Sequence, residues 1–264
     1  MVLLSICLKE QKQLISALKD RNVRIEYLEH AKDIWLRDFM PVKTGDGRYV
    51  SFRYEPSYLK KSPDLRTDYK RDMEENVREK LGIEVEYSDI NLDGGNVVVS
   101  PSKRMAIISD RVFSENPERD REELLAELER LLAAKVIIIP SLHPDFDMTG
   151  HADVMVRFVD ETTVIGNNPL SPKGLEWRVK QMLKKHGIRV IDFPYFESPK
   201  ESAVGTYLNF LETDDTIFLP VFGHEMDGEA IAAAKSIFTK EIVPVRCEDI
   251  AKEGGCLNCI SWER

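Results

Sequence analysis

The sequence predicts an α/β fold, because one pattern recurs five times along its 264 residues. Each repeat has an apolar β-like run, a charged amphipathic helix, a second β-like run and a short polar or Gly-rich stretch. The period is about 50 residues, in the range where repeats indicate a closed or stacked array of supersecondary units. Alternating strands and helices also fit an open, doubly wound parallel sheet. The five polar stretches at equivalent positions favour a ring whose strand ends converge on an axis.

The helices follow from apolar residues spaced 3.6 positions apart, as in helix 118–133, where Leu124, Leu128 and Leu131 fall on one face. The strands follow from short apolar or alternating runs, as in strand 23–28, where Val23 and Ile25 alternate with charged residues. Given as first strand, helix and second strand, the five repeats are 3–8, 10–20 and 23–28; 49–54, 70–81 and 83–87; 105–109, 118–133 and 136–139; 163–166, 173–186 and 190–193; and 216–220, 227–238 and 242–246.

Glycines mark the ends of two helices. Gly82 follows helix 70–81 and Gly187 follows helix 173–186, at positions where a residue with positive φ commonly terminates a helix. No linker, low-complexity tract or block of like charge divides the chain. We therefore predict a single domain, residues 1–264. The aperiodic stretches 55–68 and 194–206 are predicted to be loops over a site.

Composition limits the class of partner. The formal net charge is −9, which argues against nucleic acid or an anionic membrane as the main partner and is compatible with a small cationic substrate. No apolar run approaches the ~20 residues that cross a bilayer. The apolar residues 1–8 lack a basic segment and are too short for a signal peptide, so they are predicted to be the first strand. With only four cysteines, we expect reduced thiols and a cytoplasmic protein.

A histidine and an aspartate lie two positions apart in Gly150-His151-Ala152-Asp153. On an extended segment both side chains would point to the same side, because side-chain direction in a strand has a period of two. A group that moves protons near neutral pH would then lie beside one that holds a cation, which fits half of an active site. The same residues also fit a structural His–Asp pair at the mouth of a strand.

Near the C-terminus, Cys256 and Cys259 form a C-x-x-C pair, a spacing found in zinc and redox sites. A structural zinc site usually has a second Cys/His pair at short spacing, which Cys7, Cys247 and the five histidines do not provide. A thioredoxin-type redox motif is expected at a strand-to-helix turn, whereas this pair lies only a few residues before residue 264. A regulatory disulfide between the two cysteines stays open as an alternative.

The five polar stretches, taken together, resemble those of the guanidino-group-modifying superfamily, the five-bladed α/β propellers called penteins. Within it, the chain is similar to agmatine deiminase and the Porphyromonas-type peptidylarginine deiminase family. The resemblance rests on Trp35-Leu36-Arg37-Asp38, Asp93-Gly94-Gly95-Asn96, Gly150-His151-Ala152-Asp153, Tyr207-Leu208-Asn209-Phe210 and Gly254-Gly255-Cys256-Leu257-Asn258-Cys259. It implies a propeller in which a pseudo-fivefold repeat of strand–helix–strand units surrounds a central active site.

The resemblance also implies roles for individual residues. Cys259 matches the nucleophile, His151 the general acid/base, and Asp93 the acid that orients the histidine. Asp38 and Asp153 match carboxylates that grip a guanidinium. The substrate-binding residues implied in addition are Trp35, Arg37 and Asn96. Taken alone, Trp35 also fits a core residue or a site wall, and Arg37 a surface charge or the partner of an axial carboxylate.

The implied chemistry is consistent with these residue types. A guanidinium is planar and cationic, so two carboxylates can hold it through paired hydrogen bonds while a thiolate attacks its central carbon. We expect a thiouronium intermediate on Cys259 that water hydrolyses with the help of His151, and no metal or organic cofactor. The expected enzyme is a hydrolase of C–N bonds in linear amidines that converts agmatine to N-carbamoylputrescine and ammonia, a step of putrescine formation.

Several alternatives stay open on the same scaffold. Peptidylarginine, free arginine or another guanidine shares the reacting group, and an amine in place of water would give amidino transfer. A non-catalytic pentein that acts as a binding protein is a further alternative. Asn258 stands where these enzymes often have a histidine, which leaves the substrate open. Family members often form homodimers, so a homodimer is possible for this chain.

Overall fold

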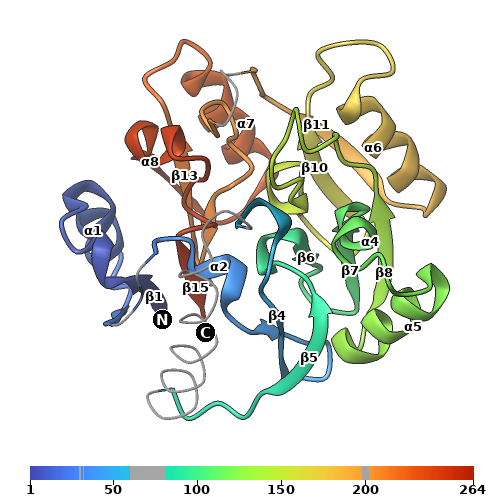
Figure 1. Cartoon of the computed structure of the whole chain (residues 1–264). Coiled ribbons are helices and arrows are strands. Elements are labelled where there is room, and N and C mark those ends of the chain that lie inside the picture. Colours follow the sequence, from blue (N-terminus) through green and yellow to red (C-terminus); the bar gives the residue numbers. More distant parts are fainter. Residues whose placement is uncertain (30, 32, 60–80, 198–201) are drawn as a thin grey trace.

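The structure is a computed structural model that describes residues 1–29, 31, 33–59, 81–197 and 202–264. The described strands form five separate three-stranded sheets (Figure 1). In order of neighbours across each sheet, the strands are β15 (Ser261–Glu263), β1 (Val2–Ser5) and β2 (Ile25–Leu28); β3 (Val42–Lys43), β4 (Tyr49–Arg53) and β5 (Glu86–Asn91); β6 (Val97–Val99), β7 (Met105–Ser109) and β8 (Lys135–Ile139); β9 (Val156–Phe158), β10 (Thr163–Asn167) and β11 (Arg189–Phe193); and β12 (Leu211–Glu212), β13 (Thr216–Val221) and β14 (Glu241–Arg246).

All five sheets have the same strand arrangement. A short edge strand lies antiparallel to the middle strand, and the middle strand lies parallel to the third. A parallel pair needs a crossover connection, which a helix usually supplies. The crossover helices are α1 (Lys12–Lys19), α4 (Arg111–Glu115) with α5 (Arg121–Leu132), α6 (Leu175–Lys185) and α7 (Asp227–Ile237). The remaining described helices are α2 (Leu36–Phe39), α8 (Glu248–Lys252) and the 3-10 turns η1 (Ile6–Leu8), η2 (Ser57–Leu59), η4 (Gly94–Asn96) and η5 (Ala152–Val154).

The predicted strand–helix–strand units are confirmed in the described residues, with ends displaced by a few positions. The clearest displacement is β5, which runs over Glu86–Asn91 where the sequence predicts 83–87. Residues 70–80 of predicted helix 70–81 and most of predicted loop 55–68 lie outside the described residues. Gly187 has a φ of +79° and follows α6 as predicted. Helix α5 begins at the N-cap Asp120, whose carboxylate accepts from the backbone N–H groups of Glu122 and Glu123.

The edge strands β3, β6, β9, β12 and β15 are absent from the sequence prediction. Each is two or three residues long, too short to show a periodic pattern. All five contribute residues to the wall of one cavity of about 500 Å³, which we call the axial cavity. Its wall includes Val42, Val98, Arg157, Glu212 and Glu263, one from each of these strands. The short strands therefore face a common centre.

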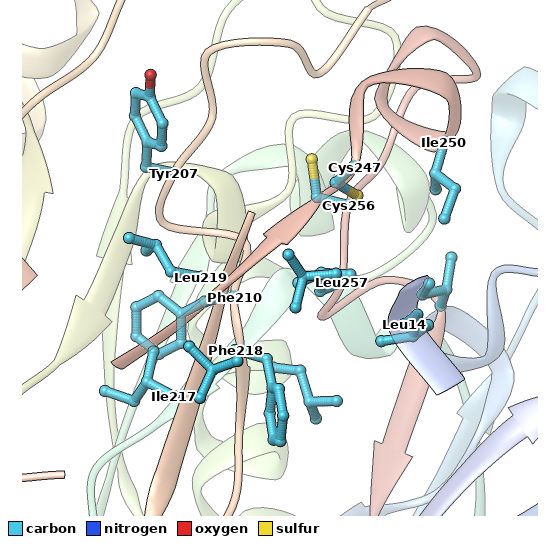
Figure 2. Close-up of a cluster of buried hydrophobic side chains, with 14 of the residues drawn as sticks. Leu14, Tyr207, Phe210, Ile217, Phe218, Leu219, Cys247, Ile250, Cys256 and Leu257 are labelled. Atoms are coloured by element: carbon cyan, nitrogen blue, oxygen red, sulfur yellow. The ribbon is translucent and has the colours of Figure 1, made fainter. Parts of the chain in front are cut away.

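Apolar side chains fill the space between sheets and helices. The largest cluster contains Phe218 and Leu219 of β13 together with Leu14 of α1 (Figure 2). Phe210 and Leu257 belong to the same cluster. Leu257 is two residues from Cys259, so the core of this sheet extends to the segment that carries the predicted nucleophile. In the part of the chain that the structure describes, each helix is too short or too polar to cross a lipid bilayer.

Candidate active site

Cys259 lies in the tight turn between α8 and β15 and is 6% exposed. The side-chain oxygen of Asn209 accepts from the backbone N–H groups of Cys256 and Cys259, at 3.1 and 3.2 Å. On its other side, the carbonyl of Cys259 accepts from the backbone N–H of Arg37 at 3.0 Å. The Cys259 thiol points to Asp153, with Sγ 3.6 Å from Oδ2. The turn is therefore fixed on two sides, and its sulfur lies beside a carboxylate.

His151 is buried between two other carboxylates. Its Nε2 lies 2.8 Å from Oδ2 of Asp93, which precedes η4, and its Nδ1 lies 3.6 Å from Oδ1 of Asp38 on α2. Asp38 Oδ1 also accepts from the backbone N–H of Gly95 at 3.2 Å. One ring nitrogen is thus held by Asp93, and the other faces the predicted guanidinium-binding carboxylate.

The predicted extended conformation of residues 151–153 is wrong. His151 itself is extended, with φ −70° and ψ 140°, but residues 152–154 form the 3-10 turn η5, and strand β9 begins only at Val156. The turn is stabilised because Asn96 Oδ1 accepts from the backbone N–H of Ala152 at 3.2 Å. His151 and Asp153 still reach the same site, but through a turn rather than through strand alternation.

The glycine pair of the second motif is explained by close contact. A Cβ on Gly95 would lie 2.5 Å from Asp38 Oδ1 and 2.7 Å from His151 Nδ1, and one on Gly94 would lie 2.1 Å from the Arg37 carbonyl oxygen. All three distances are shorter than any van der Waals contact, so no side chain fits at either position. The two glycines let the backbone pass between α2 and His151.

Burial and like charge set the protonation of the site. Burial alone lowers the pKa of His151, but the charge of Asp38 and the hydrogen bond to Asp93 outweigh it and raise the pKa to about 10. Burial raises the pKa of Asp38 to about 7 against the attraction of His151. Burial, then the charges of Asp153 and Asp38, raise the pKa of the Cys259 thiol well above its usual value. At neutral pH the histidine is therefore an imidazolium, and the cysteine is a neutral thiol.

The two carboxylate oxygens of Asp153 differ in their hydrogen-bond partners. Its Oδ2 accepts from the side-chain amides of Asn209 at 2.9 Å and Asn258 at 2.7 Å. Its Oδ1 is buried and has no hydrogen-bond partner among the residues that the structure describes. A buried carboxylate oxygen without a donor is costly, so this atom fits a cationic donor supplied by a ligand.

Of the other predicted substrate-binding residues, Trp35 lies at the site. A Cβ on Gly255 would come within 2.4 Å of the Trp35 ring and 3.0 Å of Cys259 Cβ. The half-buried indole therefore packs on the turn that carries the thiol and acts as a wall beside it.

Arg37 and Asn96 are engaged with protein groups. The Arg37 guanidinium pairs with Glu263 and donates through Nε to the carbonyl of Asn258 at 3.3 Å. Asn96 Oδ1 accepts from the backbone N–H of Ser109 at 2.9 Å as well as from Ala152. Both residues hold the backbone around the site in place. Arg37 pairs with Glu263, a carboxylate in the wall of the axial cavity, which is one of the two roles that the sequence allowed for it.

Three site residues are missing from the sequence prediction. Tyr58 on η2 donates to Asp93 Oδ2 at 2.9 Å, and burial with the charge of Asp93 raises the pKa of Tyr58 well above its usual value. Asn209 and Asn258 contact Asp153, as described above. Asn209 and Asn258 belong to quoted motifs, but nothing in a motif shows which atoms an amide contacts. Tyr58 lies in a stretch predicted only as a loop over the site.

The two cysteines of the C-x-x-C pair point to different neighbours. Cys256 Sγ lies 3.6 Å from the Ala203 carbonyl oxygen and next to Cys247 (Figure 2), whereas Cys259 Sγ points to Asp153. Burial raises the pKa of the Cys256 thiol well above its usual value. All four cysteines are free, and the described ranges contain no group of three or more His, Cys, Asp or Glu side chains that could hold a metal ion.

The sequence matches the Porphyromonas-type peptidyl-arginine deiminase family over residues 2–264. It is 25% identical to agmatine deiminase of Stutzerimonas stutzeri (strain A1501), covering 98% of this chain and 82% of that protein. Its fold is similar to substrate-bound C. jejuni agmatine deiminase, with a TM-score of 0.78, 16% identity, and coverage of 100% of this chain and 92% of the other. Agmatine deiminase of Enterococcus faecalis gives a TM-score of 0.76 at 18% identity, with coverage of 99% and 92%.

The family match spans almost every residue, and the fold similarity covers the same length. The chain belongs to the Porphyromonas-type peptidyl-arginine deiminase family.

Proposed function

We propose that this protein is a cysteine-dependent hydrolase of a small guanidine, with agmatine as the substrate. The observation that carries the proposal is the unpaired, buried Asp153 Oδ1, on a carboxylate that contacts Cys259 Sγ at 3.6 Å. Asp38 supplies a second carboxylate beside His151. Two carboxylates near a thiol suit a planar cation with several N–H donors. The relatives named agmatine deiminase favour agmatine within this class.

Binding would activate the nucleophile. A guanidinium between Asp38 and Asp153 offsets the negative charge that keeps the Cys259 thiol protonated, so the thiol proton leaves to solvent and a thiolate remains. The thiolate attacks the central guanidine carbon, and a new S–C bond forms. His151, already an imidazolium, then gives its proton to the departing nitrogen as the C–N bond breaks and ammonia leaves.

A second half-reaction would complete the cycle. The thiouronium on Cys259 is attacked by water, and the now neutral His151 takes a proton from that water. The S–C bond breaks as the remaining hydroxyl proton of the adduct passes to the sulfur, the ureido product leaves, and the resting thiol is restored. Asp93, which contacts Nε2 at 2.8 Å, keeps Nδ1 turned toward the reacting groups through both halves.

We also propose that residues 1–264 form a single five-bladed α/β propeller. The five sheets share one strand arrangement, and the edge strand of each lines the axial cavity, which is the pattern expected when sheets surround an axis. Four residues of this wall, Arg37, Asp153, Asn258 and Glu263, also belong to the candidate site or contact it. The proposal puts the reaction at the centre of the ring.

Reduced thiols and the family resemblance support two smaller proposals. Four free cysteines fit a cytoplasmic protein. A homodimer is proposed from the resemblance alone, and light scattering coupled to size-exclusion chromatography tests it.

The first experiment is colorimetric detection of ureido product and ammonia from purified protein with agmatine, arginine, a blocked arginine peptide or methylated arginines. We expect turnover of agmatine that disappears in Cys259→Ala and in His151→Ala, with both variants folded by circular dichroism. Turnover of a different guanidine would keep the chemistry and change the substrate. No turnover of any of these guanidines, or full activity in Cys259→Ala, would overturn the proposal.

A further inference from the structure

Two side-chain amides converge on one oxygen of Asp153. Asn209 Nδ2 and Asn258 Nδ2 both donate to Oδ2, at 2.9 and 2.7 Å. We propose that Asn209 and Asn258 form an amide clamp that fixes Asp153 Oδ2 and leaves Oδ1 for the guanidinium, so that both asparagines are positioning residues. This inference rests on the proposed function of the same site.

The clamp also fixes Asp153 relative to the nucleophile. Asn209 uses its Nδ2 to hold Asp153, and the Oδ1 of the same amide accepts from the backbone N–H groups of Cys256 and Cys259. The backbone carbonyl of Asn209 also accepts from the backbone N–H of Asn258, at 3.1 Å. Asn209 is 0% exposed and Asn258 6% exposed. One buried amide therefore sets the distance between the carboxylate that would hold the substrate and the sulfur that would attack it.

Neutral donors have a specific advantage at this position. A lysine or arginine in contact with Asp153 would also fix the carboxylate, but its charge would compensate the anion and compete with a cationic substrate. Amides donate hydrogen bonds without cancelling the charge. An amide also does not titrate, so Asn258 donates at any pH, whereas the histidine that often occupies this position in similar enzymes can change its charge near neutrality.

Removing either donor should loosen the orientation of Asp153 and leave its Oδ2 with one donor fewer. A hydrogen bond to a charged group corresponds to about 10- to 100-fold in an equilibrium constant. The loss should appear mainly in KM, because the clamp acts on binding.

The test compares four variants of the full chain with agmatine, or with whichever guanidine the wild type hydrolyses. Asn258→Leu removes one donor, and Asn258→His restores a donor. Asn209→Asp keeps an oxygen acceptor for the Cys256 and Cys259 N–H groups, but puts a carboxylate oxygen in place of the N–H donor to Asp153. Asn116→Leu is the control, because it removes a buried amide that contacts Asn91 and Val112 rather than the site.

We expect Asn258→Leu and Asn209→Asp to raise KM about 10- to 100-fold, with smaller changes in kcat. Asn258→His should recover most of the lost affinity. Asn116→Leu should lower thermal stability without raising KM. These outcomes separate positioning from a general loss of stability.

The clamp is wrong if the wild type turns over its substrate while Asn258→Leu and Asn209→Asp keep the wild-type KM. A separate measurement identifies failure of the proposed function itself. If the wild type turns over no guanidine, and Cys259→Ala binds none by calorimetry, the proposed function fails and the clamp fails with it. If Cys259→Ala binds a guanidine, the four substitutions are repeated in that background, and unchanged affinity overturns the clamp.

Discussion

Burial and the charges of Asp153 and Asp38 raise the pKa of the Cys259 thiol, and hydrogen bonds involving Cys256 and Asn209 only partly offset them. We therefore expect the thiol to be unreactive until a cation binds beside it. In the proposed function, this would tie reactivity to the presence of substrate. A thiolate formed only beside a bound guanidinium also avoids oxidation and stray alkylation.

The Asp153→Asn variant tests this dependence. It removes the nearest negative charge from Cys259, so the thiol pKa should fall and the thiolate fraction at pH 8 should rise. We expect iodoacetamide to alkylate Cys259 about tenfold faster than in the wild type, the change that one pKa unit gives, although turnover is lost. Peptide mapping by mass spectrometry distinguishes Cys259 from Cys256. An unchanged or slower rate would mean that the carboxylates do not govern the thiol.

Asp38 should lower the stability of the native protein above neutral pH. Its pKa is raised from 3.8 to about 7, so the native state keeps a proton that the unfolded state has lost. Its contribution to stability therefore decreases as pH rises from 3.8 to about 7. His151 acts differently, because its raised pKa stabilises the native state below pH 6.5 and this contribution is lost as pH rises toward about 10.

We expect Asp38→Asn to unfold at a higher temperature than the wild type at pH 8, by about 2–4 °C, and to gain less at pH 5. The reason is that three aspartates surround one imidazolium, and the substitution removes one negative charge. Thermal unfolding at pH 5 and pH 8 measures this change in unfolding temperature, and the substitution Asp145→Asn at an exposed position is the control. An equal gain at both pH values would contradict the pKa argument. Turnover should be lost, since Asp38 is a proposed substrate ligand.

At the scale of elements, the turn η4 passes between α2 and His151 with no room for a side chain. Gly95→Ala would push a methyl group against Asp38 Oδ1 and His151 Nδ1. We expect a loss of about 10²-fold in kcat/KM, the effect of displacing catalytic groups by about 1 Å. Gly228→Ala in α7 is the matched control, because a Cβ there meets no atom within 4 Å. Wild-type kinetics in Gly95→Ala would show that the site tolerates the displacement.

The sequence predicts elements with strong periodicity and misses those without it. Strands such as β7 and helices such as α5 have enough residues to show a period, and the structure has them close to the predicted bounds. The five edge strands have only two or three residues each and are set by pairing with a neighbouring strand. The turn η5 is set by contacts such as Asn96 to Ala152, which are far apart in the sequence. A local pattern cannot show such contacts.

The same division applies to the candidate site. Cys259, His151, Asp93, Asp38 and Asp153 were identified through motifs, and the structure brings all five together. What the sequence could not show is which amides hold them. Tyr58, Asn209 and Asn258 are ordinary polar residues until their partners are known.

At the scale of the whole molecule, one sheet joins the two ends of the chain. In the sheet β15-β1-β2, Leu3 of β1 pairs with Trp262 of β15. Trp262 is 3% exposed and donates through Nε1 to the Pro41 carbonyl at 2.8 Å. Strand β15 follows directly after the turn that carries Cys259, so closure of this sheet and formation of the site depend on each other.

Trp262→Ala should lower the free energy of unfolding by about 3–5 kcal/mol, because it leaves a cavity and an unpaired carbonyl, and should also reduce turnover. Trp262→Phe, which keeps most of the ring and loses the hydrogen bond, should cost about 1 kcal/mol and remain folded. Calorimetry measures both and should show one cooperative transition if residues 1–264 form a single domain. Two separate transitions, or wild-type stability in Trp262→Ala, would contradict this account.

The sheet that unites both ends has a further consequence. The backbone N–H of Arg264 donates to the carbonyl of Met1 at 3.2 Å, and the two ends lie side by side (Figure 1). A short peptide could join residues 264 and 1, and new ends could be opened in the exposed segment 171–173 before α6. Such a circular permutant would keep every sheet and every contact at Cys259. The strand pairing within the five sheets therefore does not depend on which residue comes first in the chain.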